Sequence, residues 1–347
     1  MTLNAQPATA GGDGPDGPSV TGRRRLLCRV VRVGWLVVLV IALALALRSR
    51  WSEVGDQLAS LDPGLLLLSA GIGLVGLGLS AGIWHAMLAG IGEPLPLAAS
   101  LRVFFVGQIG KYVPGAVWPV VTQAALAREH GIVPRATVTA VTLFLWVHLV
   151  TGVAVGITAL VATGVLPLVT LAALLLLMAL LAPPVLRWTL TRLLRLARRA
   201  PMRRQPTGRH LLVAGAWAAA MWICYGVHLQ VLTAAIGEPI DVIRAIGVFA
   251  AGWVVGFVLL IAPAGVGPRE AAIVALLPLP AAAGLLVALA SRLVLTLADA
   301  LWAGVTAVRP VLIRRPTRAA PATGGADDEP VAKASAGGGR RGAGDGR

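Results

Sequence analysis

The chain has 347 residues, of which 57% are hydrophobic and 13% charged, and its formal net charge is +15. Soluble globular domains carry about 25% charged residues, so this composition excludes an ordinary soluble domain and indicates a polytopic helical membrane protein. The two cysteines, Cys28 and Cys224, lie far apart in apolar surroundings. They therefore indicate neither a disulfide framework nor a metal site.

Apolar runs predict an all-α integral membrane domain over residues 23–315 with six spans. The predicted spans are 33–47, 65–90, 136–162, 165–186, 210–236 and 283–309. The flanking segments 1–22 and 316–347 are rich in Gly, Pro and Ala and are predicted to be disordered tails. A cleaved signal peptide is the alternative for the first run, and Arg48 and Arg50 directly after it disfavour cleavage.

Clusters of arginine predict the orientation of these spans. The clusters lie at 23–32, 187–209 and 309–318, and the predicted crossings place all three on one side of the membrane. Because positively charged loops face the cytoplasm, we expect both termini to be cytoplasmic in a bacterial cytoplasmic membrane. The positive charge is then a topology signal, and nucleic acid is not an expected partner.

Two further apolar segments, 96–130 and 241–281, are each interrupted by proline and glycine. The first break is Pro114-Gly115, and the second runs from Pro263 to Pro268. Irregular backbone at membrane depth is tolerated only where protein or a water-filled cavity satisfies its polar groups, so both segments are predicted to be re-entrant hairpins or broken helices. In the alternative, both segments cross the membrane fully and the bundle has eight spans.

An internal repeat relates these two segments. Ile91-Gly92-Glu93-Pro94 recurs as Ile236-Gly237-Glu238-Pro239, and the same offset pairs Gly107 with Gly252. The repeats cover about 65–135 and 210–281, and the three predicted crossings between the hairpins make the second copy inverted. Inverted repeats with matching broken segments are typical of alternating-access transporters, whose site lies where the breaks meet. The alternative is that Gly-Glu-Pro simply marks helix ends.

The hairpins hold most of the candidate binding residues. Lys111 and Lys333 are the only lysines among 30 Lys and Arg residues, and Lys111 lies at the first break. A compact ammonium differs from a guanidinium at a tight anion site, which favours a functional Lys111 over chance retention. The predicted substrate-binding residues are Lys111, Tyr112, Pro114, Gly115, Gly265, Gly267, Arg269 and Glu270. Free N–H groups at the following half-helix starts are expected to assist in holding a lipid phosphate.

Three polar residues of the spans complete the candidates: Arg292, Asp299 and His148. Arg292 and Asp299 share one helix face with Thr296, which either points into the site or forms a structural Arg–Asp pair. His148 is interpreted as a proton-coupling residue or, by preference, as a hydrogen-bonded structural histidine.

The remaining candidates also have alternatives. Glu270 is expected to hold Arg269 or to receive a cationic headgroup, and solvated loop charges are the alternative for both residues. Tyr112 and Trp118 are interpreted as interfacial anchors in preference to stacking partners of a substrate.

Enzyme signatures are missing from the sequence. No His/Cys spacing matches a metal site, and Gly110-Lys111-Tyr112 lacks the pattern of a phosphate-binding loop. No Ser/His/Asp signature is present. We therefore expect no catalytic residue, no metal, no cofactor and no enzymatic activity.

Two segments resemble the signature segments of the lysylphosphatidylglycerol synthase/flippase-like integral membrane family. They are Gly107–Gly115 with Trp118, and Pro263-Ala264-Gly265-Val266-Gly267-Pro268-Arg269-Glu270. The second family signature usually reads Pro-Gly-Gly-Leu-Gly-Val-Arg-Glu, from which Ala264 and Pro268 depart. The resemblance covers roughly residues 25–310.

This resemblance implies an inverted-repeat domain that flips a polar lipid or lipid-linked headgroup across the membrane. The family's best-known members append a soluble aminoacyl-transfer domain, an activity that is not expected here because the chain ends in a predicted tail. Sister groups are linked to polyprenyl-phosphate or glycolipid pathways. The expected partners are therefore an anionic phospholipid or a polyprenyl-phosphate-linked sugar, with a lipid-synthesising enzyme or a second copy of the chain as further partners.

The alternative function is that of a non-transporting membrane protein of envelope or glycolipid biosynthesis. It would be a membrane-embedded transferase or an accessory subunit. A transferase is expected to carry an acid/base pair on a loop at one membrane face. The charged candidates lie in the hairpins and in mid-span instead, which favours transport.

Overall fold

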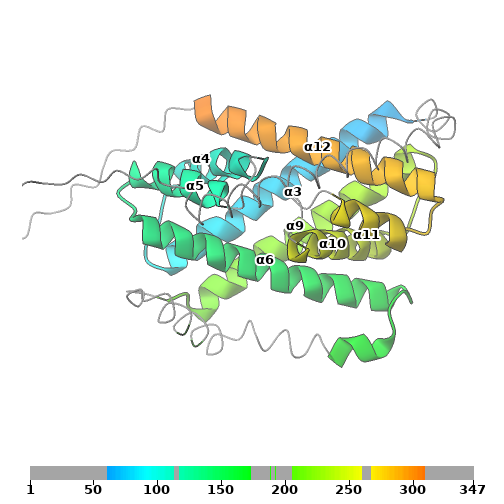
Figure 1. The fold of residues 1–347 in the computed structure, drawn as a ribbon, viewed down its shortest axis with the longest axis horizontal. Helices are drawn as coiled ribbons and strands as arrows, with labels where there is room; N and C mark the ends of the chain where they lie inside the picture. The colour runs from blue at the N-terminus through cyan, green and yellow to red at the C-terminus, as the bar shows by residue number, and fades with distance from the viewer. Residues whose placement is uncertain are drawn as a thin grey trace, which may run out of the picture. The chain divides into compact units, whose positions relative to one another are not determined.

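The computed structural model describes residues 61–112, 117–172, 188, 192, 205–259 and 267–308. Every regular element within these ranges is helical (Figure 1). The elements are α3 (Pro63–Gly90), α4 (Leu97–Gln108), η1 (Ile109–Tyr112), α5 (Trp118–Arg128), α6 (Pro134–Ala162), η2 (Leu168–Thr170), α9 (Gly208–Ala235), α10 (Val242–Val258), α11 (Pro268–Leu276) and α12 (Ala281–Val308). The predicted first span, most of the fourth and both predicted tails lie outside the described residues.

Four described helices, α3, α6, α9 and α12, are long and apolar enough to cross a membrane. Each has 28 or 29 residues, and at about 1.5 Å per residue such a helix exceeds the roughly 30 Å hydrocarbon core. Pro63 and Pro134 begin α3 and α6 at positions where the missing N–H is not needed. Four of the predicted spans and the all-α class of polytopic membrane protein are thus confirmed.

The Gly-Glu-Pro motifs end α3 and α9 in the same way. Gly92 and Gly237 have φ angles of 88° and 79°, a left-handed conformation that favours glycine. Beyond them, the Glu93 N–H donates to the Leu88 carbonyl (3.2 Å) and the Glu238 N–H to the Thr233 carbonyl (3.0 Å). The motif therefore ends a helix, and it does so with the same geometry in both copies.

The element order also repeats. A long helix, two short α-helices and a long helix run from α3 to α6, with η1 after the first short helix, and the same order without η1 runs from α9 to α12. This order extends each copy by one long helix, α6 or α12, beyond the repeat seen in the sequence. Across the copies, α4 packs on α12 and α10 packs on α6.

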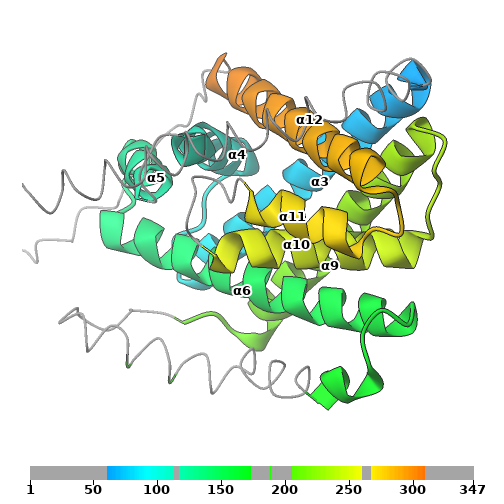
Figure 2. The same cartoon turned by 45° about the vertical axis from the view of Figure 1, so that its right-hand side comes forward.

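Helices α3 and α9, the first of each copy, lie side by side and antiparallel (Figures 1 and 2). The Asp62 N–H at the start of α3 donates to the Ala235 carbonyl at the end of α9 (2.8 Å). At the other end, a Cβ on Gly90 would lie 3.3 Å from His210. Opposite orientation of the two copies across a membrane stays a prediction, which this antiparallel packing supports.

Within each interrupted segment the two helical halves pack against each other, α4 on α5 and α10 on α11, and we call each pair a hairpin. A Cβ on Gly107 of α4 would lie 2.2 Å from the Gln123 side chain of α5, and one on Gly252 of α10 would lie 2.7 Å from Ile273 of α11. The residues paired by the repeat thus have the same role, which is to let the two halves of each hairpin approach closely. The connections 113–116 and 260–266 lie outside the described residues, and re-entry from opposite membrane faces stays a prediction.

Candidate functional site

The first hairpin reaches α12 through an ion pair. The Lys111 Nζ lies 2.5 Å from Asp299 Oδ2, and the Tyr112 hydroxyl donates to the same oxygen at 2.8 Å. Asp299 is 3% exposed, whereas the Lys111 side chain is 29% exposed. A buried carboxylate needs such partners because an unpaired charge in a low-dielectric interior is strongly destabilising.

The second hairpin reaches α12 through a pair of opposite polarity. Here the carboxylate belongs to the hairpin, and Glu270 Oε1 lies 2.5 Å from Arg292 Nη1. The other Glu270 oxygen accepts a hydrogen bond from the Gly267 N–H (2.6 Å) and so caps α11. Glu270 is 7% exposed and is therefore held by both the backbone and α12.

The sequence Gly267-Pro268-Arg269-Glu270 is a helix start. Gly267 has a φ of 95°, which only glycine adopts readily, and Pro268 occupies the first turn of α11. Glu270 then stands at the third helical position, where its carboxylate can return to the Gly267 N–H. Local backbone chemistry thus points Glu270 back to the start of α11, where it is available to Arg292.

Arg269 is the third cation of this group. Its guanidinium lies over the Phe249 ring at 4.7 Å from the centroid, and its Nη2 atom is buried without a hydrogen-bond partner in the described part of the chain. Arg292, Glu270 and Tyr112 all act on it electrostatically. We define the polar cluster as Lys111, Tyr112, Arg269, Glu270, Arg292 and Asp299. Its three cations exceed its two carboxylates by one.

Most predicted site residues within the described ranges meet in this cluster. Lys111 and Tyr112 come from η1, Arg269 and Glu270 from α11, and Gly267 begins α11. Arg292 and Asp299 project from α12 toward the two hairpins. Three predicted residues, Pro114, Gly115 and Gly265, lie outside the described residues.

The structure corrects four expectations about partners. Arg292 and Asp299 form ion pairs with the two hairpins rather than with each other, and Glu270 pairs with Arg292 instead of holding Arg269. Glu270 is buried and is not a solvated loop charge. The Gly267 N–H is taken by Glu270, so it is not free for a phosphate.

Tyr112 was predicted as a substrate-binding residue and also interpreted as an interfacial anchor. Its hydroxyl bonds to the buried Asp299, while the residue is 37% exposed, and its role as an interfacial anchor stays a prediction. Tyr112 therefore belongs to the polar cluster, and its hydroxyl stabilises the same carboxylate oxygen as Lys111.

His148 lies among aromatic rings on α6. Its ring centroid is 4.2 Å from that of Trp253, 5.0 Å from Trp222 and 5.3 Å from Phe144. The residue is 4% exposed, and neither ring nitrogen has a hydrogen-bond partner among the described residues. The expectation of a hydrogen-bonded structural histidine is therefore wrong.

The sequence reasoning missed the aromatic side of the site. Trp253 and Phe257 are stacked at 5.1 Å on α10, and Tyr225 is stacked on Phe249 at 4.7 Å. The available signal was the helical spacing of Phe249, Trp253 and Phe257, which puts three rings on one helix face. The internal repeat was a second signal, because Phe249 and Phe104 are separated by the same offset as Gly252 and Gly107.

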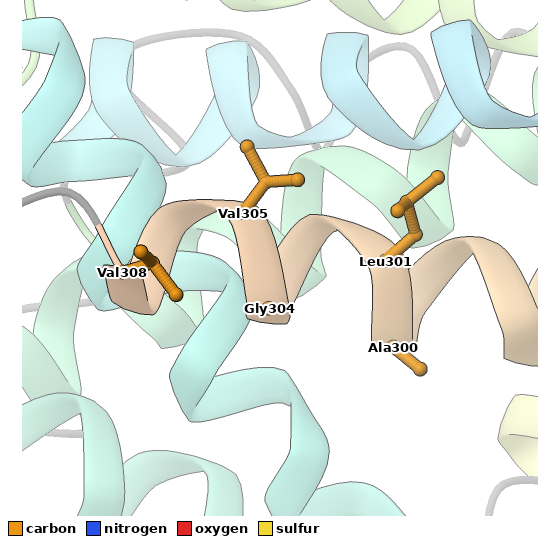
Figure 3. Close-up of a pocket in the computed structure, with 5 residues that line it drawn as sticks. All are labelled: Ala300, Leu301, Gly304, Val305 and Val308. Carbon is orange, nitrogen blue, oxygen red and sulfur yellow. The ribbon is translucent and has the colours of Figure 1, made fainter.

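A groove on α12 is separate from the polar cluster. It has a volume of about 530 Å³ and is lined by Ala300, Leu301, Gly304, Val305 and Val308. Figure 3 shows Leu301 and Val305 directed to one side of the helix and Ala300 to the other. All five residues are apolar or glycine and exposed, so this surface suits hydrocarbon contact and offers no group to bind a polar headgroup.

No described group of three His, Cys, Asp or Glu residues is arranged to hold a metal ion. Four membrane-length helices, with ion pairs that join one of them to both hairpins, define a multi-pass integral membrane protein. The chain belongs to the family described as lysylphosphatidylglycerol synthase TM region, whose model matches residues 32–303. This match confirms the resemblance drawn from the two hairpin segments and spans every residue of the polar cluster. Among curated proteins, no sequence matches the chain.

Proposed function

We propose that the protein flips a polar lipid, or the headgroup of a lipid-linked sugar, across the cytoplasmic membrane. The observation that carries the proposal is the polar cluster, in which α12 joins both hairpins through partly buried ion pairs whose carboxylates are buried. Charges within membrane segments are unfavourable by at least about 2.5–3.5 kcal/mol near the bilayer centre and usually mark substrate pathways. A protein that only needed stability would fill this position with apolar side chains.

The excess positive charge suits a phosphate. Arg269 offers a buried guanidinium nitrogen without a partner in the described structure, and a planar guanidinium binds phosphate oxygens in pairs. Lys111 is the second candidate, because a phosphate can replace Asp299 as its counter-charge. Both an anionic phospholipid and a polyprenyl-phosphate-linked sugar carry this group.

The same exchange gives a physical route to movement. The Lys111–Asp299 ion pair holds the first hairpin against α12. A phosphate bound to Lys111 would weaken this ion pair. The Glu270–Arg292 pair offers the equivalent tie at the second hairpin. If the two copies are inverted, release of one hairpin opens the site to one side of the membrane, which is alternating access.

Transport in proteoliposomes tests the proposal. Purified full-length protein is reconstituted with a fluorescent phosphatidylglycerol, and flipping is followed by dithionite quenching. We expect Arg269→Gln to lower the rate at least about tenfold, because a charge-assisted hydrogen bond contributes about 1.5–3 kcal/mol. The matched control is Arg102→Gln, which removes an arginine from the exposed pair with Glu129 and should leave the rate unchanged. Equal rates for Arg269→Gln and wild type would refute the role of the cluster.

A further inference from the structure

His148 differs from the two other histidines of the helical core. His228 is fully buried and bonds Ser69 (2.8 Å) and Ser291 (2.9 Å), one through each ring nitrogen. His85 bonds Ser100 (2.8 Å). His148 alone among these three has no hydrogen-bond partner on either nitrogen in the described structure. Buried polar atoms without partners are rare in native proteins and each needs an explanation.

The surroundings of His148 combine two chemical characters. Phe144, Trp222 and Trp253 cover it with aromatic surface. His148 contacts Trp253, and the Arg269 guanidinium lies over Phe249, one turn away on the same face of α10, so His148 lies near the polar cluster. A group bound at His148 would therefore lie among aromatic faces, with the Arg269 cation near the next turn of α10.

These surroundings select a hydroxyl over an ammonium group. A neutral imidazole has one donor and one acceptor, and a hydroxyl can match both. An ammonium group can only donate, and it would be repelled by the Arg269 cation. The C–H faces of a polyol or sugar also pack well against indole rings, whereas a charged amine would first have to be stripped of water.

We infer that His148 hydrogen-bonds a headgroup hydroxyl while Arg269 binds the adjacent phosphate, so that the site takes a phosphodiester lipid with a hydroxylated headgroup. This inference rests on the proposed function and narrows its substrate class. His148 is then a specificity-determining residue, and Trp222 and Trp253 hold its ring in place.

Lipid binding to the purified full-length protein tests the inference by native mass spectrometry. The decisive pair is phosphatidylglycerol and phosphatidylmethanol, which have the same charge and differ in the headgroup hydroxyls. We expect the wild type to prefer phosphatidylglycerol about tenfold, since one or two hydrogen bonds contribute about that factor. Phosphatidylethanolamine should bind more weakly than either lipid. A polyprenyl glucosyl phosphate in a parallel arm distinguishes a lipid-linked sugar from a glycerophospholipid.

Two substitutions assign the preference to the histidine. His148→Phe keeps an aromatic ring among its neighbours and should equalise the two lipids while phosphatidylmethanol still binds. His148→Gln keeps a donor and an acceptor and should retain part of the preference. His85→Phe, which removes a histidine bonded to Ser100, is the matched control and should retain all of it.

Three outcomes overturn the inference: equal binding of the two lipids by the wild type, an unchanged preference in His148→Phe, or no binding of either lipid. The proposed function fails in a different way. In that case the wild type still prefers the hydroxylated lipid but moves none of it in proteoliposomes, so the two failures are distinguishable.

Discussion

Lys111 is the residue for which the sequence was most informative. Almost every cation of the chain is arginine, but position 111 is a lysine. The Lys111 ammonium pairs with Asp299 and lies 5.3 Å from the centroid of the Tyr112 ring. Both partners were beyond prediction, because ion pairing between η1 and α12 depends on how distant segments pack. The same limit explains why a structural Arg292–Asp299 pair was left open as an alternative. Helical spacing shows that two residues share a face, but it does not show what opposes that face.

Lys111→Ala should abolish transport and also lower stability, because Asp299 stays buried and loses its counter-charge. We expect a loss below the roughly 3–5 kcal/mol of a fully buried pair, since Lys111 is partly exposed. The double variant Lys111→Ala/Asp299→Asn should recover stability but not transport. Thermal unfolding and flipping assays on the same preparations separate the two effects. A double variant as active as wild type would show that the pair is purely structural.

At the scale of elements, the sequence predicted the helices whose length depends on hydrophobicity and whose ends depend on proline and glycine. The four spans followed from apolar length, and the hairpin halves followed from their bounding proline and glycine residues. The predicted ends of α3 and α9 agreed with the structure because the chain turns there in a left-handed conformation. That conformation favours glycine, so Gly92 and Gly237 mark both ends in the sequence. The aromatic packing around His148 was not predicted, because it joins three helices from both copies of the repeat.

Glycine substitutions on α9 test how closely α9 and α10 must pack. A Cβ on Gly226 would lie 2.6 Å from the Ile246 Cα of α10, so Gly226→Ala should push backbone away from backbone and lower the melting temperature. Gly215 lies on the same helix with nothing within 4 Å of its Cβ position. Gly215→Ala should therefore be neutral or stabilise by up to about 1 kcal/mol through helix propensity. Equal melting temperatures for the two variants would contradict the close packing of α9 on α10.

For the whole molecule, the central prediction is that the two copies have opposite orientations in the membrane. The antiparallel packing of α3 and α9 and the exchanged pairs α4–α12 and α10–α6 support it. The sequence indicated this arrangement only through short matches around Gly-Glu-Pro. Contacts between the copies could not be read from it, because similar copies can be related by more than one symmetry.

Cysteine labelling measures that orientation. Pro94 and Pro239 are equivalent in the two copies, and both are exposed just beyond a helix end. In a variant without Cys28 and Cys224, we expect Pro94→Cys and Pro239→Cys to react with a membrane-impermeant maleimide from opposite sides. Reaction of both positions from the same side would rule out the inverted arrangement.

The two ties between α12 and the hairpins have one further consequence. The fold repeats, but the charges exchange their signs: the first hairpin gives a cation to an acid of α12, and the second gives an acid to a cation of α12. No operation that interchanges the copies leaves this pattern unchanged. Under the proposed function, a charged group would therefore meet a different electric field at each hairpin. If the protein works by alternating access, the states in which one or the other hairpin leaves α12 would therefore differ in energy, because each breaks an ion pair of opposite polarity.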